Sequence, residues 1–371
     1  MTPNASVQAR VLQVLNEYKV QGIEEGVQVA AYHQGKLILD IVSGTITGIN
    51  ALRADDMIYS WSMTKGITAL AVHIAVQKNL LAYDDLVVRY WPEFGANGKA
   101  HITVRQLLIH TAGLPNMPRV TVAEMCDWDL MCRHFAAMTP MTHPGEVPAY
   151  HAISYGWLVG EVLRRATGKS VTQYVQDEIC APLGITNLHI GVPQKRIIDC
   201  ARLTFDGVHG SLNVDHCGSP DMVENPALFA NQAIVQMACM PSINMMTSAR
   251  ALAMVYAALV GHGINGVRLL NERTVDHARM VQRYAIDATS QGVMVMGLGF
   301  QLPAYDTVSA MAQRRGVFGH GGWGGSISFA DPENDFAFAL TKTKMVNSDD
   351  TVPVSIAVAH AVRAELGIPE A

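Results

Sequence analysis

A serine and a lysine three residues apart, Ser62 and Lys65, are the residues of this chain best suited to nucleophilic chemistry. At this spacing two residues lie on the same face of a helix, so the lysine ammonium can reach the serine hydroxyl. A serine hydroxyl is a poor nucleophile near neutral pH, and a partly desolvated lysine can withdraw its proton or support a neighbour that does. The pair therefore predicts attack of Ser62 on a carbonyl and formation of an acyl-enzyme.

The elements around the pair favour this chemistry. A strand-like stretch, residues 57–61, precedes Ser62, and a long apolar helix pattern runs from about residue 66 to residue 81. Ser62 is therefore expected at the first turn of a helix, where free N–H groups and the positive end of the helix dipole face a developing negative charge. Taken alone, the spacing also fits a helix cap followed by a solvated lysine.

Further blocks along the chain narrow the choice. They are residues 107–115 (LLIHTAGLP), Pro144-Gly145 followed by Tyr150-His151-Ala152, residues 155–160 (YGWLVG) and residues 318–326 (FGHGGWGGS). In this order and at these separations they resemble the serine β-lactamase and penicillin-binding-protein superfamily, specifically its class C-like branch. Within that branch the chain is most similar to the family VIII carboxylesterases and related acyltransferases. The resemblance covers nearly the whole chain.

Strand and helix patterns fit an α+β fold. Helix patterns dominate residues 66–261, and an amphipathic helix is expected at residues 351–366. The strand-like runs are residues 27–32, 36–41, 317–318, 326–330 and 336–343, the first two forming a hairpin with a glycine turn. Proline- and glycine-rich loops are expected at residues 113–118, 140–148 and 207–226.

Strands at both ends and helices between them predict one antiparallel sheet flanked by helices, with an inserted helical domain and the active site in the cleft. This is a class C β-lactamase-like arrangement. Residues 1–60 and 246–371 are expected to form the sheet domain, and residues 61–245 the mainly helical domain with the Ser-x-x-Lys helix and the Tyr150 loop. A chain of 371 residues, 49% of them hydrophobic, exceeds what one core usually fills.

The resemblance implies that the catalytic residues are Ser62, Lys65 and Tyr150. A phenol is normally protonated at neutral pH, yet a nearby lysine ammonium can lower its pKa until the phenolate accepts the Ser62 proton. Lys65 and Tyr150 would then act as one base system. His110, in the block at residues 107–115, is expected to order a loop through hydrogen bonds between its side chain and the backbone.

The block at residues 318–326 occupies the place of the family's Lys-Thr-Gly strand. The resemblance assigns the backbone N–H groups of Ser62 and Trp323 to the oxyanion hole. His320 is expected to donate a hydrogen bond to the Tyr150 oxygen or to substrate. The expected substrate-binding residues are Trp61, Ala152, His320, Gly321, Gly322 and Trp323.

Ala152 departs from the family pattern and bears on the substrate. β-Lactamases and penicillin-binding proteins usually carry an asparagine there that binds the acyl-side amide, whereas Ala152 offers a methyl group. A site built to hydrogen-bond an amide loses discrimination without that partner, and an ester acyl group makes no such demand. The sequence therefore favours a serine hydrolase acting on small-molecule carboxylic esters.

Three alternatives stay open. The acyl group could pass to a small-molecule alcohol or amine, which would make the protein an acyltransferase. The substrate could be a β-lactam or a D-amino-acid peptide or amide, or the chain could be a non-catalytic binding or assembly protein of the same fold. The sequence argues against an α/β-hydrolase lipase, because no serine lies in a Gly-x-Ser-x-Gly motif and no parallel strand pattern surrounds Ser62.

Composition limits the partners and the location. A net charge of −5 without a Lys/Arg run argues against nucleic acid, and no stretch is long and apolar enough to span a bilayer. The first residues show no secretory signal pattern, so a cytoplasmic location is expected. The six cysteines have no paired close spacing and are expected to be reduced thiols. Neither a metal nor an organic cofactor is expected. The oligomeric state stays open.

Overall fold

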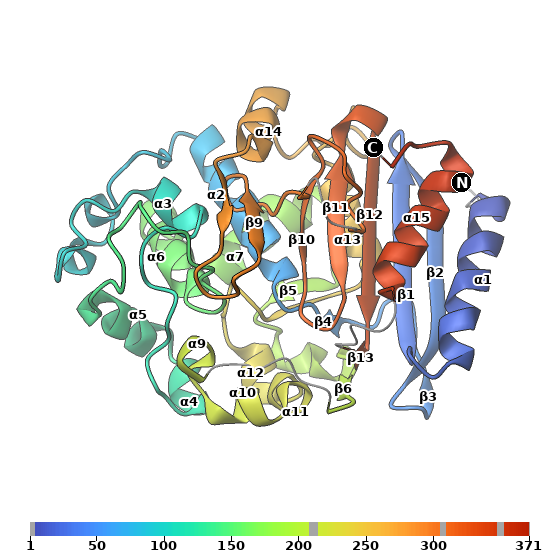
Figure 1. Cartoon of the computed structure of the whole chain (residues 1–371), viewed down its shortest axis with the longest axis horizontal. Helices are drawn as coiled ribbons and strands as arrows, with labels where there is room; N and C mark the ends of the chain where they lie inside the picture. Colours follow the sequence, from blue (N-terminus) through green and yellow to red (C-terminus); the bar gives the residue numbers. More distant parts are fainter. Residues whose placement is uncertain (1–3, 208–213, 305–308, 347–351, 371) are drawn as a thin grey trace.

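The computed structural model describes residues 4–207, 214–304, 309–346 and 352–370. In this part of the chain the largest sheet has six strands in the order β10-β11-β12-β1-β2-β3, each antiparallel to its neighbours (Figure 1). The strands are β1 (Gly26–His33), β2 (Lys36–Ile46), β3 (Asn50–Ala51), β10 (Phe318–Gly321), β11 (Ile327–Asp331) and β12 (Phe336–Lys342). The two ends of the chain thus build one sheet, as the sequence predicts.

The β1–β2 hairpin forms where the sequence predicts it. Its turn residues Gln34 and Gly35 have φ of 51° and 69°, and two positive values are typical of a two-residue type I′ turn. β1 lies between β2 and β12, with Val29 opposite Ile41 on one side and Leu340 on the other. This central position explains why nearly all of β1 is buried.

Helices cover both faces of the sheet. α1 (Ala5–Val20) and α15 (Val354–Leu366) pack together on one face, and α13 (Ala249–Ala257) packs against β1 and β12 on the other (Figure 1). Valines of the two outer helices and phenylalanines of β11 and β12 share one apolar cluster, which includes Val7, Val11, Val14, Phe329, Phe336, Phe338, Val358 and Val362. Burial of these side chains fixes the sheet, and with it the edge strand β10 that carries His320.

The middle of the chain is mainly helical. At its centre lies α2 (Met63–Gln77), whose residues from Met63 to Ala75 are all buried, as expected for a helix that is apolar on every side. α6 (Tyr155–Thr167), α7 (Val171–Val175) and α14 (Glu272–Arg279) pack against α2. The other helices include α3 (Val104–Leu108), α4 (Val122–Met125), α5 (Trp128–Ala137), α8 (Ala181–Leu183), α9 (Val214–Cys217), α10 (Pro220–Glu224), α11 (Pro226–Ala230) and α12 (Ala233–Met237).

Short strands complete the fold and set the start of α2. β7 (Met245–Thr247) pairs with β4 (Ile58–Tyr59) on one side and with β5 (Leu188–Ile190) on the other. The remaining pairs are β6 (Thr204–Phe205) with β13 (Lys344–Met345), and β8 (Arg283–Ile286) with β9 (Val293–Met296). Because β4 ends three residues before Ser62, its pairing with β7 fixes where the serine lies.

The structure corrects two features of the sequence analysis. The predicted loop at residues 207–226 is not found in the described part of that stretch, which contains α9 and α10. Pro220 stands at the first turn of α10, where a missing N–H is harmless, so a proline-rich stretch can be helical there. The β8–β9 hairpin is not predicted at all. Residue 351, the expected start of the last helix, lies outside the described residues, and the domain boundaries at residues 60 and 246 stay a prediction.

Candidate active site

Ser62 is the N-cap residue of α2 and directly follows a strained residue. Trp61 has φ of 45°, a left-handed conformation that is unfavourable for a bulky side chain and is common at functional sites. Its indole is buried against Trp323, with the two ring centroids 4.9 Å apart at 67°. The strained residue and the aromatic contact therefore hold the Ser62 turn against the end of β10.

Two threonines of α2 tie the helix to the start of β7 and to the segment before it. Thr64 Oγ1 accepts a hydrogen bond from Met245 N at 3.0 Å, and Thr68 Oγ1 donates to Pro241 O at 2.6 Å. Both side chains are fully buried, so these bonds are shielded from water. They bring the backbone around Ser242 next to Lys65.

Lys65 is fully buried, and its Nζ contacts three oxygen atoms. These are Ser62 Oγ at 3.0 Å, Ala152 O at 2.7 Å and Ser242 O at 3.1 Å. Burial disfavours the ammonium and lowers the pKa of Lys65 well below its usual value. A neutral amine has two hydrogens for the two carbonyls and one lone pair, which is left for the Ser62 hydroxyl. The arrangement suits a general base.

Tyr150 lies beside this pair, with Lys65 Nζ 4.9 Å from its ring centroid. Burial raises the pKa of Tyr150; a hydrogen bond with Ser62 lowers it in part, and the charge of Asp287 raises it further. The net pKa of Tyr150 therefore rises, contrary to the expectation, because burial penalises the phenolate. Burial favours the neutral forms of both Lys65 and Tyr150.

Two histidines support the Tyr150 loop. His110 Nδ1 accepts a hydrogen bond from His151 N at 3.0 Å, and the His110 ring lies 4.7 Å from the Tyr150 ring between centroids. His151 Nδ1 lies 2.6 Å from Ala149 O, and His151 Nε2 accepts from Leu114 N at 3.0 Å. The prediction that His110 orders a loop through backbone hydrogen bonds is confirmed.

His320 lines the cavity from β10 and is almost fully buried. Its Nδ1 lies 2.7 Å from Gly321 O, which can only accept, so Nδ1 carries the hydrogen. Burial and the nearby Lys65 lower the pKa of His320 to about 3, and Nε2 has no hydrogen-bond partner among the described residues. His320 therefore offers an acceptor toward the site, where the sequence analysis expects a donor.

The turn after β10 packs closely on the backbone before Ser62. Gly322 N donates to Ser326 O at 2.7 Å and closes the turn that carries Trp323. A Cβ added at Gly322 would lie 2.6 Å from Ser60 O, so only glycine allows this approach. The contact brings the backbones of the Ser62 and Trp323 segments together. Assignment of their amides to an oxyanion hole stays a prediction.

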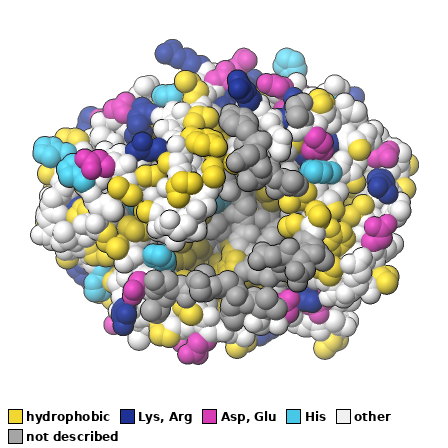
Figure 2. Space-filling view, in the orientation of Figure 1, with side chains coloured by type: hydrophobic (Ala, Val, Ile, Leu, Met, Phe, Trp, Pro, Cys, Tyr) yellow, Lys and Arg dark blue, Asp and Glu magenta, His cyan; other side chains and the backbone are white. Residues whose placement is uncertain are grey.

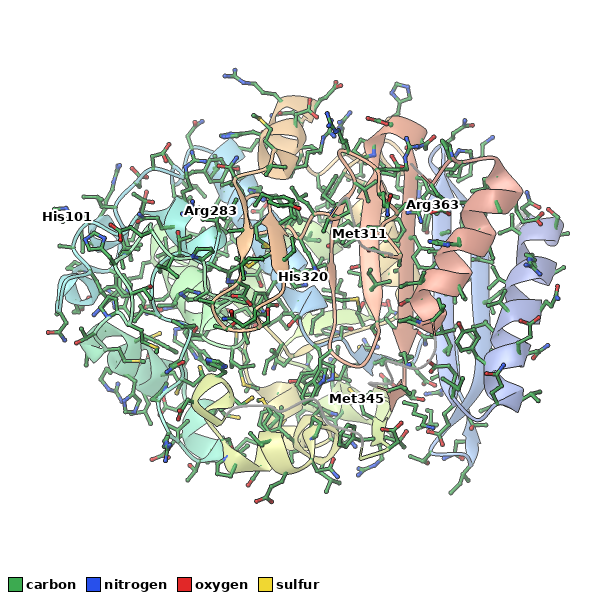
Figure 3. All side chains as sticks on the ribbon, in the orientation of Figure 1. His101, Arg283, Met311, His320, Met345 and Arg363 are labelled. Atoms are coloured by element: carbon green, nitrogen blue, oxygen red, sulfur yellow. The ribbon has the colours of Figure 1, made fainter. Side chains whose placement is uncertain are left out.

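A cavity of about 530 Å³ opens at this junction. Figure 2 shows the face to be hollowed near its centre, and Figure 3 shows His320 on the edge strand of the sheet, beside the β8–β9 hairpin. Its lining combines the polar residues Ser62, Tyr150, Asp287, Ser290, Gln301 and His320 with an apolar wall of Val293, Met294, Val295, Met296, Leu302, Pro303 and Met311, and it also includes Gly321 and Trp323. Apolar pockets with a few converging polar groups are typical of small-molecule sites.

The structure does not bring every expected residue to the cavity surface. Trp61 is buried beneath Trp323, Gly322 faces Ser60, and Ala152 contributes its carbonyl to Lys65, so none of the three is among the lining residues. Asp287 lines the cavity and is missed by the sequence analysis. The turn-forming residues from Asp287 to Gly292 indicate a turn at this position. The sequence around them does not indicate that this turn lies next to Tyr150.

Neither a metal site nor a membrane span is found in the part of the chain that the structure describes. Its histidine, cysteine, aspartate and glutamate side chains form no group of three that could hold a metal ion. None of the described helices is both long and apolar enough to cross a bilayer. All six cysteines, which are among the described residues, are free thiols.

Known proteins share much of this sequence and fold. The sequence profile of the family described as "Beta-lactamase" matches residues 12–363. The chain is 31% identical over 345 residues to "Esterase/beta-lactamase LipL" of Mycobacterium tuberculosis. The matched region covers 87% of this chain and 78% of that protein. A penicillin-binding protein homologue from Caulobacter crescentus superposes with a TM-score of 0.87 at 29% identity, covering 98% of this chain and 99% of the other. A family VIII carboxylesterase superposes with a TM-score of 0.88 at 28% identity, covering 98% and 99%.

Proposed function

The chain belongs to the Beta-lactamase family and is a serine hydrolase, and we propose that it cleaves carboxylic esters through an acyl-enzyme on Ser62. The resemblance found in the sequence is thereby confirmed at the level of the family and the fold. The observation that carries the proposal is the position of Lys65 Nζ, 3.0 Å from Ser62 Oγ, with its two other polar contacts made to backbone carbonyls.

In the proposed acylation step, the Ser62 hydroxyl gives its proton to the Lys65 amine while Oγ attacks the ester carbonyl carbon. The N–H groups of Ser62 and Trp323 stabilise the oxyanion, and each donor contributes roughly 3 kcal/mol in the transition state. As the C–O bond to the alcohol breaks, the Tyr150 phenol supplies the proton that the leaving oxygen needs. Lys65 then returns its proton to Tyr150, and both groups are neutral again.

Deacylation repeats these steps with water in place of the alcohol. Water gives its proton to the Lys65–Tyr150 pair and attacks the acyl carbon, and the Ser62 oxygen leaves with a proton. The same steps with an alcohol or an amine as acceptor would make the enzyme an acyltransferase. His320 Nε2, a buried acceptor without a partner among the described residues, favours a hydroxyl-bearing acceptor.

Three features favour esters over β-lactams or D-amino-acid amides. Ala152 has no amide to bind the acyl-side amide of such substrates. His320 is neutral, so it offers no permanent charge to a ring carboxylate. The wall at Val293–Met296 is apolar and suits an acyl chain. LipL, named both esterase and β-lactamase, keeps the β-lactam alternative worth testing.

A substrate panel tests the proposal. p-Nitrophenyl esters of increasing acyl length are assayed beside nitrocefin and a D-amino-acid amide, with and without an added primary alcohol. We expect kcat/KM for the best ester to exceed that for nitrocefin by about a hundredfold or more. Equal efficiency on nitrocefin would favour a β-lactamase, and ester product formed mainly with the added alcohol would favour an acyltransferase.

The proposal also includes a cytoplasmic location and no cofactor. Six free thiols, three of them fully or almost fully buried, are stable in a reducing compartment. The acyl transfer described above uses only side chains and backbone groups of this chain.

A further inference from the structure

We propose that Asp287 is a positioning residue, which holds Tyr150 in place for proton transfer and joins it to the apolar wall of the cavity. The inference rests on the function proposed above, because it gives Asp287 a part in the reaction of Ser62. Asp287 directly follows β8 and lies among the residues that line the cavity. It acts through the backbone of Tyr150 and not on the reacting atoms.

The contact with Tyr150 is direct. Asp287 Oδ1 accepts a hydrogen bond from Tyr150 N at 2.7 Å, across 137 residues of sequence, and a second one from Thr289 N at 3.2 Å. Next to it, Ala288 N donates to Pro148 O at 3.0 Å. The β8–β9 turn and the Tyr150 loop are therefore joined at two points, and the position of the phenol depends on both.

The other carboxylate oxygen closes the hairpin turn. Asp287 Oδ2 accepts hydrogen bonds from Thr289 Oγ1 at 2.7 Å, from Ser290 N at 3.0 Å and from Ser290 Oγ at 2.6 Å. The hairpin continues into β9, whose residues Val293–Met296 line the cavity. One buried side chain thus fixes both the proposed proton donor and the wall proposed to hold the acyl group.

The charge of Asp287 also acts on Tyr150. Asp287 is only 3% exposed, and burial raises its pKa, but the hydrogen bonds from Ser290, Thr289 and Tyr150 outweigh burial and hold the pKa below its usual value. Both oxygens accept from backbone N–H groups, so an asparagine could keep the bond from Tyr150 N but would lose the one from Ser290 N. The carboxylate adds to the effect of burial on Tyr150 and keeps the phenol protonated.

Two substitutions separate position from charge. Asp287→Asn keeps one oxygen that can accept from Tyr150 N, removes the charge and replaces the acceptor of Ser290 N by an amide nitrogen, whereas Asp287→Ala removes both oxygens. Asp331→Asn is the matched control, because Asp331 is also buried and forms an ion pair with Arg314. Asp331 lies at one end of β11, whereas Ile327, at the other end, pairs with Gly321 of the cavity lining. Each is made in the full chain, alone and with Tyr150→Phe. The measurements are kcat and KM for p-nitrophenyl acetate, the melting temperature and fluorophosphonate labelling.

We expect Asp287→Ala to lower kcat by about tenfold to a hundredfold with KM little changed, because misplacing a catalytic group by about 1 Å has effects of this size. In the Tyr150→Phe background the same change should lower kcat by much less. Asp287→Asn should retain more of kcat than Asp287→Ala, because one oxygen still accepts from Tyr150 N. Asp331→Asn should lower the melting temperature without changing kcat.

Three outcomes would overturn the inference: equal losses for Asp287→Ala with and without Tyr150, a kcat for Asp287→Asn no higher than for Asp287→Ala, or a control that loses as much kcat. If Asp287→Ala does not fold, kcat of Asp287→Asn with and without Tyr150→Phe decides. A wild-type protein that neither hydrolyses esters nor labels at Ser62 would instead contradict the proposed function, so the two failures are distinguishable.

Discussion

The side-chain nitrogen of Lys65 lies 3.0 Å from Ser62 Oγ, while carbonyls of Ala152 and Ser242 accept its other hydrogen bonds at 2.7 Å and 3.1 Å. An amine in this position presents its lone pair to Ser62, whereas an ammonium would direct a third N–H there and could not take up a proton. Burial favours the amine, because it lowers the pKa of Lys65. The three contacts fit both protonation states of Lys65, and burial favours the amine, which can take up the Ser62 proton.

The pH dependence of ester hydrolysis should report this amine. Burial makes the ammonium less stable, so Lys65 loses its proton well below the usual value of 10.5 and is active as a base from that lower pH upward. We expect kcat/KM for p-nitrophenyl acetate to rise from acid pH and to level off well below pH 10.5. A rate that rises only as the pH approaches 10.5 would contradict a neutral Lys65.

Lys65 and Tyr150 should behave as one unit. Because both take part in moving one proton, Lys65→Ala and Tyr150→Phe should each lower kcat by about a thousandfold, with the double variant hardly slower than either. Steady-state kinetics of the three variants give the coupling. Losses that multiply in the double variant would mean that the two residues act separately.

Gly322 tests the backbone contact beside Ser62. In Gly322→Ala the new Cβ would lie 2.6 Å from Ser60 O and push the Trp323 turn away, so we expect kcat to fall by about a hundredfold, as when one oxyanion donor is lost. Gly321→Ala is the neighbouring control, because its Cβ would meet nothing closer than Gln301 Oε1 at 3.7 Å. Similar losses in both variants would show that the contact with Ser60 is not responsible.

Buried histidines predict a steep loss of stability in acid. The pKa of His73 is lowered by burial to about 3 and that of His151 to about 4, while the usual value is 6.5. Below pH 6.5 the unfolded chain binds a proton on each of these histidines and the folded chain does not. Each histidine therefore lowers the unfolding free energy by about 1.4 kcal/mol for every unit by which the pH falls. Urea unfolding at about pH 7 and about pH 5 measures the slope. His73 lies away from the cavity, and His73→Gln should lower the pH slope of the unfolding free energy by the equivalent of one proton. An unchanged slope would contradict a lowered pKa of His73.

Much of this arrangement can be predicted from local sequence. The Ser62–Lys65 spacing defines a helix face, and the hairpin at Gln34 and Gly35 follows from alternation and turn chemistry. Tyr150 is found through its position relative to the other blocks. The first two signals lie within a few residues and the third comes from the resemblance to a known family, so none of them needs knowledge of the tertiary structure.

Features that depend on distant contacts cannot be found in this way. The bond between Asp287 and Tyr150 joins residues 137 apart, and the sequence around Asp287 indicates only a turn. The sign of the Tyr150 pKa shift is set by how deeply the phenol is buried, and the direction of the His320 hydrogen bond by the Gly321 carbonyl. Burial and backbone geometry of this kind appear only in the folded structure.

Covalent trapping on Ser62 tests the central claim most directly. The wild-type protein and Ser62→Ala are treated with a fluorophosphonate, and intact mass followed by peptide mapping locates the label. We expect one adduct per wild-type chain, on the peptide that contains Ser62, and none on Ser62→Ala, which should keep its melting temperature and lose ester hydrolysis. Labelling at another serine, or near-normal turnover in a folded Ser62→Ala, would contradict the acyl-enzyme mechanism.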